Sequence, residues 1–298
     1  MSATIIDGKG IADTIRREVK AGAERLKAGS GIVPGLAFIL VGENPASQSY
    51  VKSKGKACEE LGFYSITEQV PASTSEAELL AMIQAFNQNP DIHGILVQLP
   101  LPKHIDEQLV IEAISPEKDV DGFHPVNIGR MMTGAESFLP CTPAGIWELL
   151  KRNDMNPAGK HVVVVGRSNI VGKPIANILL QKRQWCNAIV TVVHTAAPDL
   201  GAYTRQADIL IAAIGRPRAI DASMVKPGAI VIDVGINRIE DPASKTGTRV
   251  VGDVDFESVK EIAGAITPVP KGVGPMTIAM LMVNTLKSAE RVELQNKL

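Results

Sequence analysis

Four consecutive valines, Val162 to Val165, form the most constraining stretch of this chain. β-branched side chains pack well on a pleated surface and no polar residue interrupts the run, so the stretch predicts a strand buried on both faces. Gly166 permits a tight turn after it, and Gly172 leads into an apolar helix expected over 175–180. Such a turn is typical of an anion-binding site, because N–H groups at a helix start lack backbone partners and carry partial positive charge.

The turn has the form G-x-S-x-x-x-G through Gly166, Ser168 and Gly172. This differs from the usual dinucleotide fingerprint, G-x-G-x-x-G. Turns from strand through glycine to helix are also common in proteins that bind no nucleotide. The turn alone therefore leaves nucleotide binding open.

Composition excludes several classes of protein. The 298 residues suffice for two domains of ordinary size, and 31 Lys+Arg against 32 Asp+Glu leave no net charge to attract nucleic acid or an anionic membrane. The aromatic content of 4% argues against a surface on which bases stack. Cys58, Cys141 and Cys186 are widely spaced, without a C-x-x-C pair, which favours a reducing compartment and no metal site. With no signal peptide or membrane span in the pattern, we expect a cytoplasmic protein.

Strands and helices alternate along the chain, which predicts an α/β fold of two parallel units. We expect residues 1–140 with 270–298 in the first domain and 141–269 in the second. Residues 116–130 are expected to be loop, and a last helix over 276–294 is expected to pack back on the first domain. The expected strands are 35–42, 64–70, 93–98, 161–165, 189–193, 208–212 and 229–233, and the other expected helices are 8–28, 44–61, one starting at 75, and 144–151.

The helix from residue 44 carries the clearest candidate for chemistry. At about 100° per residue, Tyr50 and Lys54 share an apolar face, whereas Lys52 and Lys56 lie on the opposite, solvated one. Lys54 either extends its amine to solvent or holds it out of water. Because desolvation favours the neutral amine, a buried lysine is suited to give and take a proton near neutral pH.

Two further polar residues join this candidate. Parallel sheets bind ligands at the carboxyl ends of their strands, where the helix of Tyr50 and Lys54 begins and where Gln98 ends another strand. Asp121, in Lys118-Asp119-Val120-Asp121-Gly122, is either part of this site or a local turn cap. His93, His104, His124 and His161 show no metal-ligand spacing, and we expect them to be structural.

Taken in order, these motifs resemble the bifunctional methylenetetrahydrofolate dehydrogenase/methenyltetrahydrofolate cyclohydrolase family over nearly the whole chain. The residues that carry the resemblance are Tyr50-x-x-x-Lys54, Val97-Gln98-Leu99-Pro100-Leu101-Pro102, Lys118-Asp119-Val120-Asp121-Gly122, Pro140-Cys141-Thr142-Pro143, Gly166-Arg167-Ser168 and Gly272-Val273-Gly274-Pro275-Met276-Thr277. Lys271 departs from the family, whose loop usually has glycine there.

The resemblance implies a folate-binding catalytic domain followed by a Rossmann-like NADP-binding domain. The enzyme would oxidise 5,10-methylenetetrahydrofolate with NADP and hydrolyse the methenyl product to 10-formyltetrahydrofolate. Lys54 would transfer the proton of the hydrolysis, Gln98 would position its amine, Tyr50 would stack on the folate, and Asp121 would hold the pterin. The resemblance further implies folate contacts from the loop 268–275 at Pro268, Gly272, Gly274 and Pro275, and a homodimer.

Charge at the second expected strand of the second domain favours NADP over NAD. NAD sites commonly place an acid there for the ribose 2′-OH, but residues 189–193 are followed by no acid until Asp199. Arg167 and Thr195, with Ser168, can instead bind a 2′-phosphate, beside the anion-binding turn at Gly166 and Gly172. Gly235 and Ile236 resemble the nicotinamide contact of the family, although an ordinary glycine turn would also account for them.

Two alternatives stay open at this point. One is a monofunctional NADP-dependent dehydrogenase of a related small substrate, in which Lys54 only binds. The other is a non-catalytic module that senses NADP. Lys54, Gln98 and Asp121 together speak against the sensor, which has no use for a buried amine outside its nucleotide site.

Overall fold

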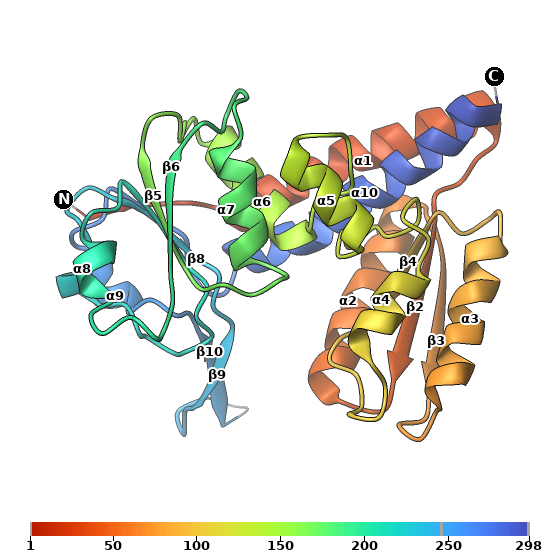
Figure 1. Ribbon diagram of the computed structural model, residues 1–298, viewed down its shortest axis with the longest axis horizontal. Helices are drawn as coiled ribbons and strands as arrows, with labels where there is room; N and C mark the ends of the chain where they lie inside the picture. Colours follow the sequence, from red (N-terminus) through yellow and green to blue (C-terminus); the bar gives the residue numbers. More distant parts are fainter. Residues whose placement is uncertain (1, 245–246, 297–298) are drawn as a thin grey trace. The chain divides into compact units, whose positions relative to one another are not determined.

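The computed structural model describes residues 2–244 and 247–296. The chain forms two compact units, each with its own sheet (Figure 1). Unit 1 contains Met1–Ala12 and Thr142–Thr277, and unit 2 contains Asp13–Cys141 and Ile278–Leu298.

Unit 2 is built on a parallel sheet of three strands in the order β3, β2, β4. The central strand β2 (Gly35–Val41) is buried along its whole length, as an apolar run between two neighbours should be. Helices connect the strands and cover the sheet, which is the expected form of a parallel α/β unit. The other elements are β3 (Tyr64–Val70), β4 (Gly94–Val97), α2 (Pro45–Leu61), α3 (Glu76–Gln88), α4 (Glu107–Ala113) and α5 (Pro125–Thr133).

Local sequence fixes the ends of the helices in unit 2. The side chain of Asn44 accepts hydrogen bonds from the backbone N–H groups of Ala46 and Ser47 at the start of α2, and Gly62 ends this helix with φ 72. Ser75 and Glu78 form a reciprocal capping box at the start of α3, which begins where the sequence predicts a helix. These caps set where α2 begins, and therefore where Lys54 lies relative to the end of β2.

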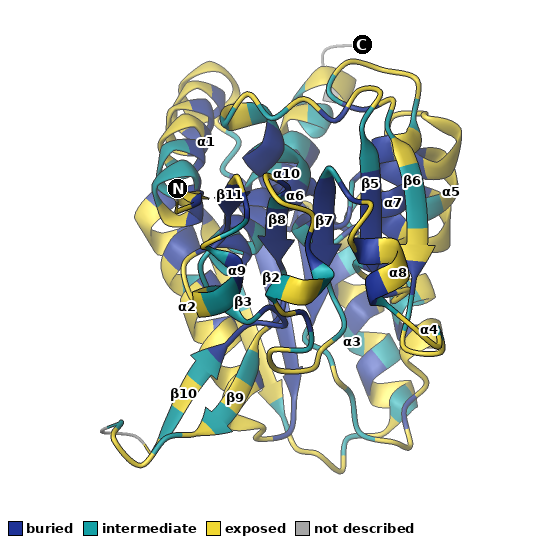
Figure 2. Ribbon diagram, turned by 90° about the vertical axis from the view of Figure 1, so that its left-hand side faces the viewer, coloured by how far each residue is buried: buried dark blue, intermediate teal, exposed yellow. Residues whose placement is uncertain are grey.

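Unit 1 contains a parallel sheet of six strands in the order β1, β11, β8, β7, β5, β6. Val162 to Val165 in β5 are fully buried, which confirms the strand predicted to be covered on both faces (Figure 2). The strands are β1 (Thr4–Ile5), β11 (Ala265–Ile266), β8 (Ile230–Asp233), β7 (Ile209–Ala212), β5 (His161–Val165) and β6 (Ile189–Val193). Around them lie α6 (Cys141–Arg152), α7 (Gly172–Leu180), α8 (Gly201–Thr204), η1 (Ala222–Met224), α9 (Phe256–Val259) and the antiparallel hairpin of β9 (Asn237–Glu240) and β10 (Thr248–Val251).

The strand order creates a switch point beside β5. β6 pairs with one edge of β5 and β7 with the other, so the chain leaves β5 in one direction and returns on the opposite side. In open parallel sheets, ligands bind outside the carboxyl ends of strands at such a point.

Two long helices contribute residues to both units: α1 (Gly8–Ser30) and α10 (Val273–Asn296). From Ile278 onward α10 belongs to unit 2, where Met282 lies 3.8 Å from the thiol of Cys58. The prediction that the last helix packs on the first domain is therefore confirmed. At the other end of the chain, β1 pairs with β11, so the first residues lie in unit 1 and not with the rest of 1–140.

The expected loop over 116–130 is wrong in its second half, where α5 lies. The ring of His124 accepts a hydrogen bond from the backbone of Val126, Pro125 occupies the first turn, and Gly134 ends the helix with φ 76. Asn127 and Met131, four residues apart, are its buried face. The sequence reading also did not predict α4 or the β9–β10 hairpin.

Within the ranges 2–244 and 247–296, no helix combines the length and the apolar character needed to cross a bilayer.

A pair of glycine substitutions tests the packing of unit 2. A methyl group at Gly94 would lie 2.7 and 2.8 Å from the two methyl carbons of Val120, so Gly94→Ala should destabilise the protein by about 1–3 kcal/mol through overpacking. Gly129, inside α5, has open space around it, and Gly129→Ala should stabilise by about 0.5–1 kcal/mol because the unfolded chain loses freedom. Thermal unfolding followed by circular dichroism measures both; equal shifts of Tm would contradict this packing.

Candidate functional site

The candidate residues of unit 2 meet at the carboxyl ends of its strands. Lys54 lies on α2, which follows β2, and Gln98 directly follows β4. The amine of Lys54 donates a hydrogen bond to Oε1 of Gln98 at 3.1 Å. Nε2 of Gln98 donates to the carbonyl of Leu99 at 2.7 Å, so the amide oxygen is the end that faces the amine. The predicted pairing of Lys54 with Gln98 is present.

Burial separates Lys54 from the other lysines of α2. Its exposed fraction is 7%, whereas Lys52 and Lys56 are exposed. Tyr50, one turn earlier, is 41% exposed, so the buried face of the helix continues through Val51 and Ser47 and not through the tyrosine ring. The ring is thus available for stacking against a flat ligand.

Asp121 and Lys54 act on the same buried thiol, that of Cys141. Burial raises the pKa of Cys141 well above its ordinary value. The charge of Asp121 and a hydrogen bond to its carboxylate raise this pKa further, whereas the charge of Lys54 lowers it. The charges of Asp121 and Lys54 thus both act on the thiol of Cys141, which favours Asp121 as part of this site over a local turn cap. Asp121 and Phe123 also line a largely apolar pocket together with Leu99.

The segment that carries Asp121 is braced by residues that the sequence reading missed. Nδ2 of Asn284, on α10, donates to the carbonyls of Val120 at 2.8 Å and Leu139 at 3.1 Å. Gly122 has φ 76, and a methyl group there would lie 2.5 Å from the backbone of Leu139. A polar residue inside the apolar part of α10 was a signal for Asn284, but its partners could not be inferred from it.

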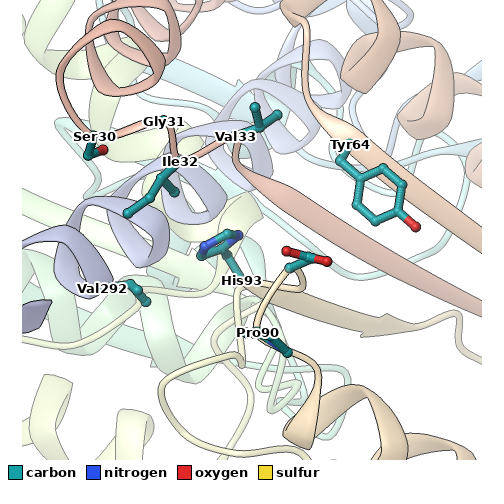
Figure 3. A pocket seen from close by; sticks show the side chains of 9 residues that line it. Ser30, Gly31, Ile32, Val33, Tyr64, Pro90, His93 and Val292 are labelled. Atoms are coloured by element: carbon teal, nitrogen blue, oxygen red, sulfur yellow. The ribbon is translucent and has the colours of Figure 1, made fainter.

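A larger hollow of about 670 Å³ lies elsewhere on unit 2 (Figure 3). Its lining includes Tyr64 and His93, and it lies at the amino ends of the strands, the edge opposite to Lys54. Nδ1 of His93 accepts a hydrogen bond from the backbone N–H of Gly35 at 3.0 Å, a structural role as expected. None of the candidate residues lines this hollow, so it is not part of the candidate site.

In unit 1, Gly166 stands at the switch point. It follows β5 with φ 128, and a methyl group on it would overlap the carbonyl oxygen of Ala213, which follows β7. A methyl group on Gly172 would overlap the carbonyl oxygen of Gly166. Both positions therefore require glycine, and the backbone is left open at the start of α7, where an anion is favoured.

The side chains of Ser168 and Arg167 in this turn differ in their hydrogen bonding within the protein. The hydroxyl of Ser168 accepts hydrogen bonds from the backbone N–H groups of Val171 at 3.1 Å and Gly172 at 3.3 Å. Arg167 is exposed and has no hydrogen bond or ion pair within the described part of the chain. The guanidinium is therefore available to an anionic ligand.

The remaining cofactor candidates follow other strands at the same edge. Thr195 lies exposed just after β6, and the first acid beyond it, Asp199, is paired with Arg205 at 3.5 Å. Gly235 and Ile236 follow β8, with the side chain of Ile236 51% exposed. The carboxyl ends of β5, β6 and β8 thus all carry predicted residues.

Pro268 and Gly272 lie in the loop between β11 and α10, whereas Gly274 and Pro275 lie in the first turn of α10. Lys271 has φ 85, a left-handed conformation that favours glycine. Lysine at this position, where the family usually has glycine, costs about 1–2 kcal/mol in backbone conformation. Across the described ranges, no group of three or more His, Cys, Asp or Glu residues is arranged to hold a metal ion.

Comparison with known proteins agrees with these geometries. Residues 6–121 match the family model described as "Tetrahydrofolate dehydrogenase/cyclohydrolase, catalytic domain", and residues 140–293 match its "NAD(P)-binding domain". The chain belongs to the tetrahydrofolate dehydrogenase/cyclohydrolase family. The resemblance inferred from the motifs is confirmed.

Individual relatives support this over nearly the full length. The bifunctional protein FolD of Prosthecochloris aestuarii is 60% identical over 96% of this chain and 98% of its own. The crystal structure of the bifunctional enzyme FolD from Campylobacter jejuni is 50% identical and superposes with a TM-score of 0.92 over 98% of this chain and all of its own (100%). The FolD of Trypanosoma brucei, solved with NADP and an inhibitor, has a TM-score of 0.93 at 38% identity, over 98% of this chain and 99% of its own. The predicted two-domain α/β fold is confirmed.

A buried acid beside Asp121 predicts a pH effect on stability. Burial raises the pKa of Asp119 to about 6, against hydrogen bonds from Asn127, His124 and Phe123 that lower it. The unfolded value is about 4, so the folded state binds this proton more tightly; the resulting stabilisation is complete below pH 4 and lost as pH rises through 6. Asp119→Asn cannot titrate there.

The Tm of the wild type minus the Tm of Asp119→Asn should therefore fall as the pH rises from 5 to 7.5, because only the wild type loses this stabilisation. Differential scanning fluorimetry in matched ionic strength measures it. A value of this difference (wild type minus variant) that stays constant, or increases with rising pH, would contradict the raised pKa of Asp119.

Proposed function

We propose that this chain oxidises 5,10-methylenetetrahydrofolate with NADP and hydrolyses the resulting methenyl compound to 10-formyltetrahydrofolate. Membership of the family supports both reactions. The observation that carries the assignment of the hydrolytic site is the nearly buried amine of Lys54, bonded to Gln98 and sharing the neighbourhood of Cys141 with Asp121. A purely nucleotide-sensing module would leave this arrangement without a purpose, and in a monofunctional dehydrogenase Lys54 would only bind the substrate.

In the hydrolysis, Lys54 transfers the proton. The amine accepts a proton from the water that adds to the methenyl carbon, and it gives a proton to the ring nitrogen that leaves as the adduct collapses. The remaining hydroxyl proton of the adduct passes to solvent as the formyl C=O bond forms. Gln98 accepts from the amine and holds it at the end of β4, which keeps the nitrogen in one place through both steps.

The folate is held by groups around this amine. The ring of Tyr50 stacks on the flat part of the substrate, and the carboxylate of Asp121 accepts hydrogen bonds from N–H groups of the pterin, a paired geometry suited to a carboxylate. By resemblance the proposal extends to Pro268, Gly272, Gly274 and Pro275 as further substrate contacts.

The residues of unit 1 fit a dinucleotide. Gly166 and Gly172 leave room for backbone N–H groups to approach phosphate where a side chain would intrude. Arg167 and Thr195, with Ser168 shaping the turn, meet the 2′-phosphate, and Gly235 with Ile236 contacts the nicotinamide. The nicotinamide supplies the hydride acceptor when bound, and the protein holds donor and acceptor in register.

The cofactor is NADP because the charges at this edge suit a phosphate. The guanidinium of Arg167 has no protein partner in the described ranges, and Asp199 is occupied by Arg205, so no free acid stands ready for a ribose hydroxyl. The near-neutral composition favours no nucleic-acid or membrane partner. We further propose that the protein is cytoplasmic and forms a homodimer. Light scattering on the purified protein tests the homodimer.

Replacing the amine tests the hydrolytic role. Lys54→Met should lower methenyltetrahydrofolate hydrolysis by about 10²–10⁴-fold, because proton transfer by a positioned group contributes that much. Loss of methenyl absorbance measures the rate. Lys52→Met, on the exposed face of the same helix, serves as the control and should retain the wild-type rate. If Lys54→Met hydrolysed at the wild-type rate, the role given to Lys54 would be wrong.

Removing the guanidinium tests the choice of cofactor. Arg167→Ala should raise the KM for NADP at least about tenfold, corresponding to roughly 1.4 kcal/mol for a charge-assisted contact, and leave the KM for NAD nearly unchanged. NADPH and NADH formation are followed at saturating methylenetetrahydrofolate. Lys182→Ala, an equal change of charge just beyond the far end of α7, is the control. An equal effect on the two cofactors would show that Arg167 does not read the 2′-phosphate.

A further inference from the structure

Two buried carboxylates lie side by side in unit 1, outside every role described so far. Asp233 is the last residue of β8 and Asp253 follows β10; their exposed fractions are 3% and 0%. Burial raises the pKa of Asp233 to about 7, and the charge of Asp253 adds to the rise. Burying two acids together is costly, and the sheet itself is already paired through its backbone. The pair therefore needs a reason beyond filling the core.

The hydrogen bonds of Asp253 supply that reason. Its Oδ2 accepts from the backbone N–H groups of Ile214 at 2.6 Å and Gly215 at 2.9 Å, in the turn that follows β7. Its Oδ1 accepts from the side-chain amide of Asn237 at 2.8 Å, just after the turn that follows β8. One carboxylate thus ties together two neighbouring turns at the carboxyl edge of the sheet.

Asp233 binds the backbone on either side of these contacts, at Gly235 and at 253–254. Its Oδ1 accepts from the N–H groups of Gly235 and Asp253, both at 2.9 Å, and its Oδ2 accepts from Val254 at 3.0 Å. A methyl group on Gly235 would overlap the backbone nitrogen and the carboxylate of Asp253, and one on Gly252 would overlap the carboxylate of Asp233. Glycine at these two positions lets the chain close directly onto the acids.

We propose that Asp253, supported by Asp233, is a positioning residue that fixes the turns at 214–215 and 235–236 against each other to receive the nicotinamide half of the cofactor. The inference rests on the proposed function only in taking Gly235 and Ile236 as the nicotinamide contact. The adenosine half, with its 2′-phosphate, is held at Gly166, Arg167 and Thr195, which make no hydrogen bond to either acid.

The experiment compares two ligands and two substitutions. Asp253→Ala removes the acceptor of two backbone donors, and we expect the Kd for NADP to rise at least about tenfold, since each lost hydrogen bond corresponds to roughly a fivefold change. The Kd for 2′,5′-ADP, which lacks the nicotinamide half, should change less than about twofold because its contacts are elsewhere. Isothermal titration calorimetry measures both on the full chain.

Asp253→Asn is the conservative variant. Its amide oxygen still accepts from Ile214 and Gly215, and the amide of Asn237 can turn to accept from the new NH₂ group, so NADP affinity should stay within about threefold of the wild type. Asp208→Ala is the matched control: Asp208 also accepts from a backbone N–H, that of His161 at 2.9 Å, but at the amino end of the strands. It should leave both affinities unchanged.

Methenyltetrahydrofolate hydrolysis, measured without NADP, reports on the integrity of unit 2 in every variant, and circular dichroism reports on that of the whole chain. Should Asp253→Ala fail to fold, Asn237→Ala removes one donor to the carboxylate and should weaken NADP by about fivefold, again sparing 2′,5′-ADP. Unchanged NADP affinity in the variant that folds, or equal weakening of both ligands, overturns the proposal. A wild type that binds NADP but does not oxidise methylenetetrahydrofolate would overturn the proposed function while leaving this comparison valid.

Discussion

A lysine side chain that is almost fully buried needs a hydrogen-bond acceptor for its amine, and the site of unit 2 depends on how Lys54 meets this need. Its acceptor, Gln98, has no freedom to turn, because its own NH₂ group is bonded to the carbonyl of Leu99. The end of β4 therefore fixes the position of the amine. The amine of Lys54 donates one hydrogen bond, to Gln98, among the described residues. Its other hydrogen-bonding positions remain for water and substrate.

The sequence was most informative where the signal is local and periodic. The helical period placed Lys54 on the buried face of α2, and the run of valines located β5 and the glycine turn after it. The starts of the helices at residues 44 and 75 were predicted for the same reason, because the caps at Asn44 and Ser75 depend on three or four neighbouring residues. The same periodicity was less accurate at Tyr50, which lies at the border of the buried face where a small rotation decides exposure.

Features held by distant partners could not be predicted in this way. Asn284 reaches Val120 across 164 residues, and Asp253 reaches Ile214 across 39. Asparagine and aspartate have too many roles for their type alone to reveal these contacts. β1, with two residues, is too short to show any period, and it is a strand only because β11 offers a free edge. α5 did carry local signals, in Pro125 and Gly134, but it overlaps the glycine- and charge-rich stretch 116–130, which resembled a loop.

The two units reach specificity by different physical means. Unit 2 uses single side chains, and the amine of Lys54 is fixed there by burial of its side chain and by its hydrogen bond to Gln98. Unit 1 uses backbone segments that glycines allow to approach closely. Among the described residues, the only buried charged side chains near its carboxyl edge are Asp233 and Asp253, and both bind backbone N–H groups. A carboxylate that accepts two successive N–H groups constrains a turn more strongly than a neutral side chain would. The placement of Asp233 and Asp253 thus follows from the same requirement as Gly166: the backbone itself must be the binding surface.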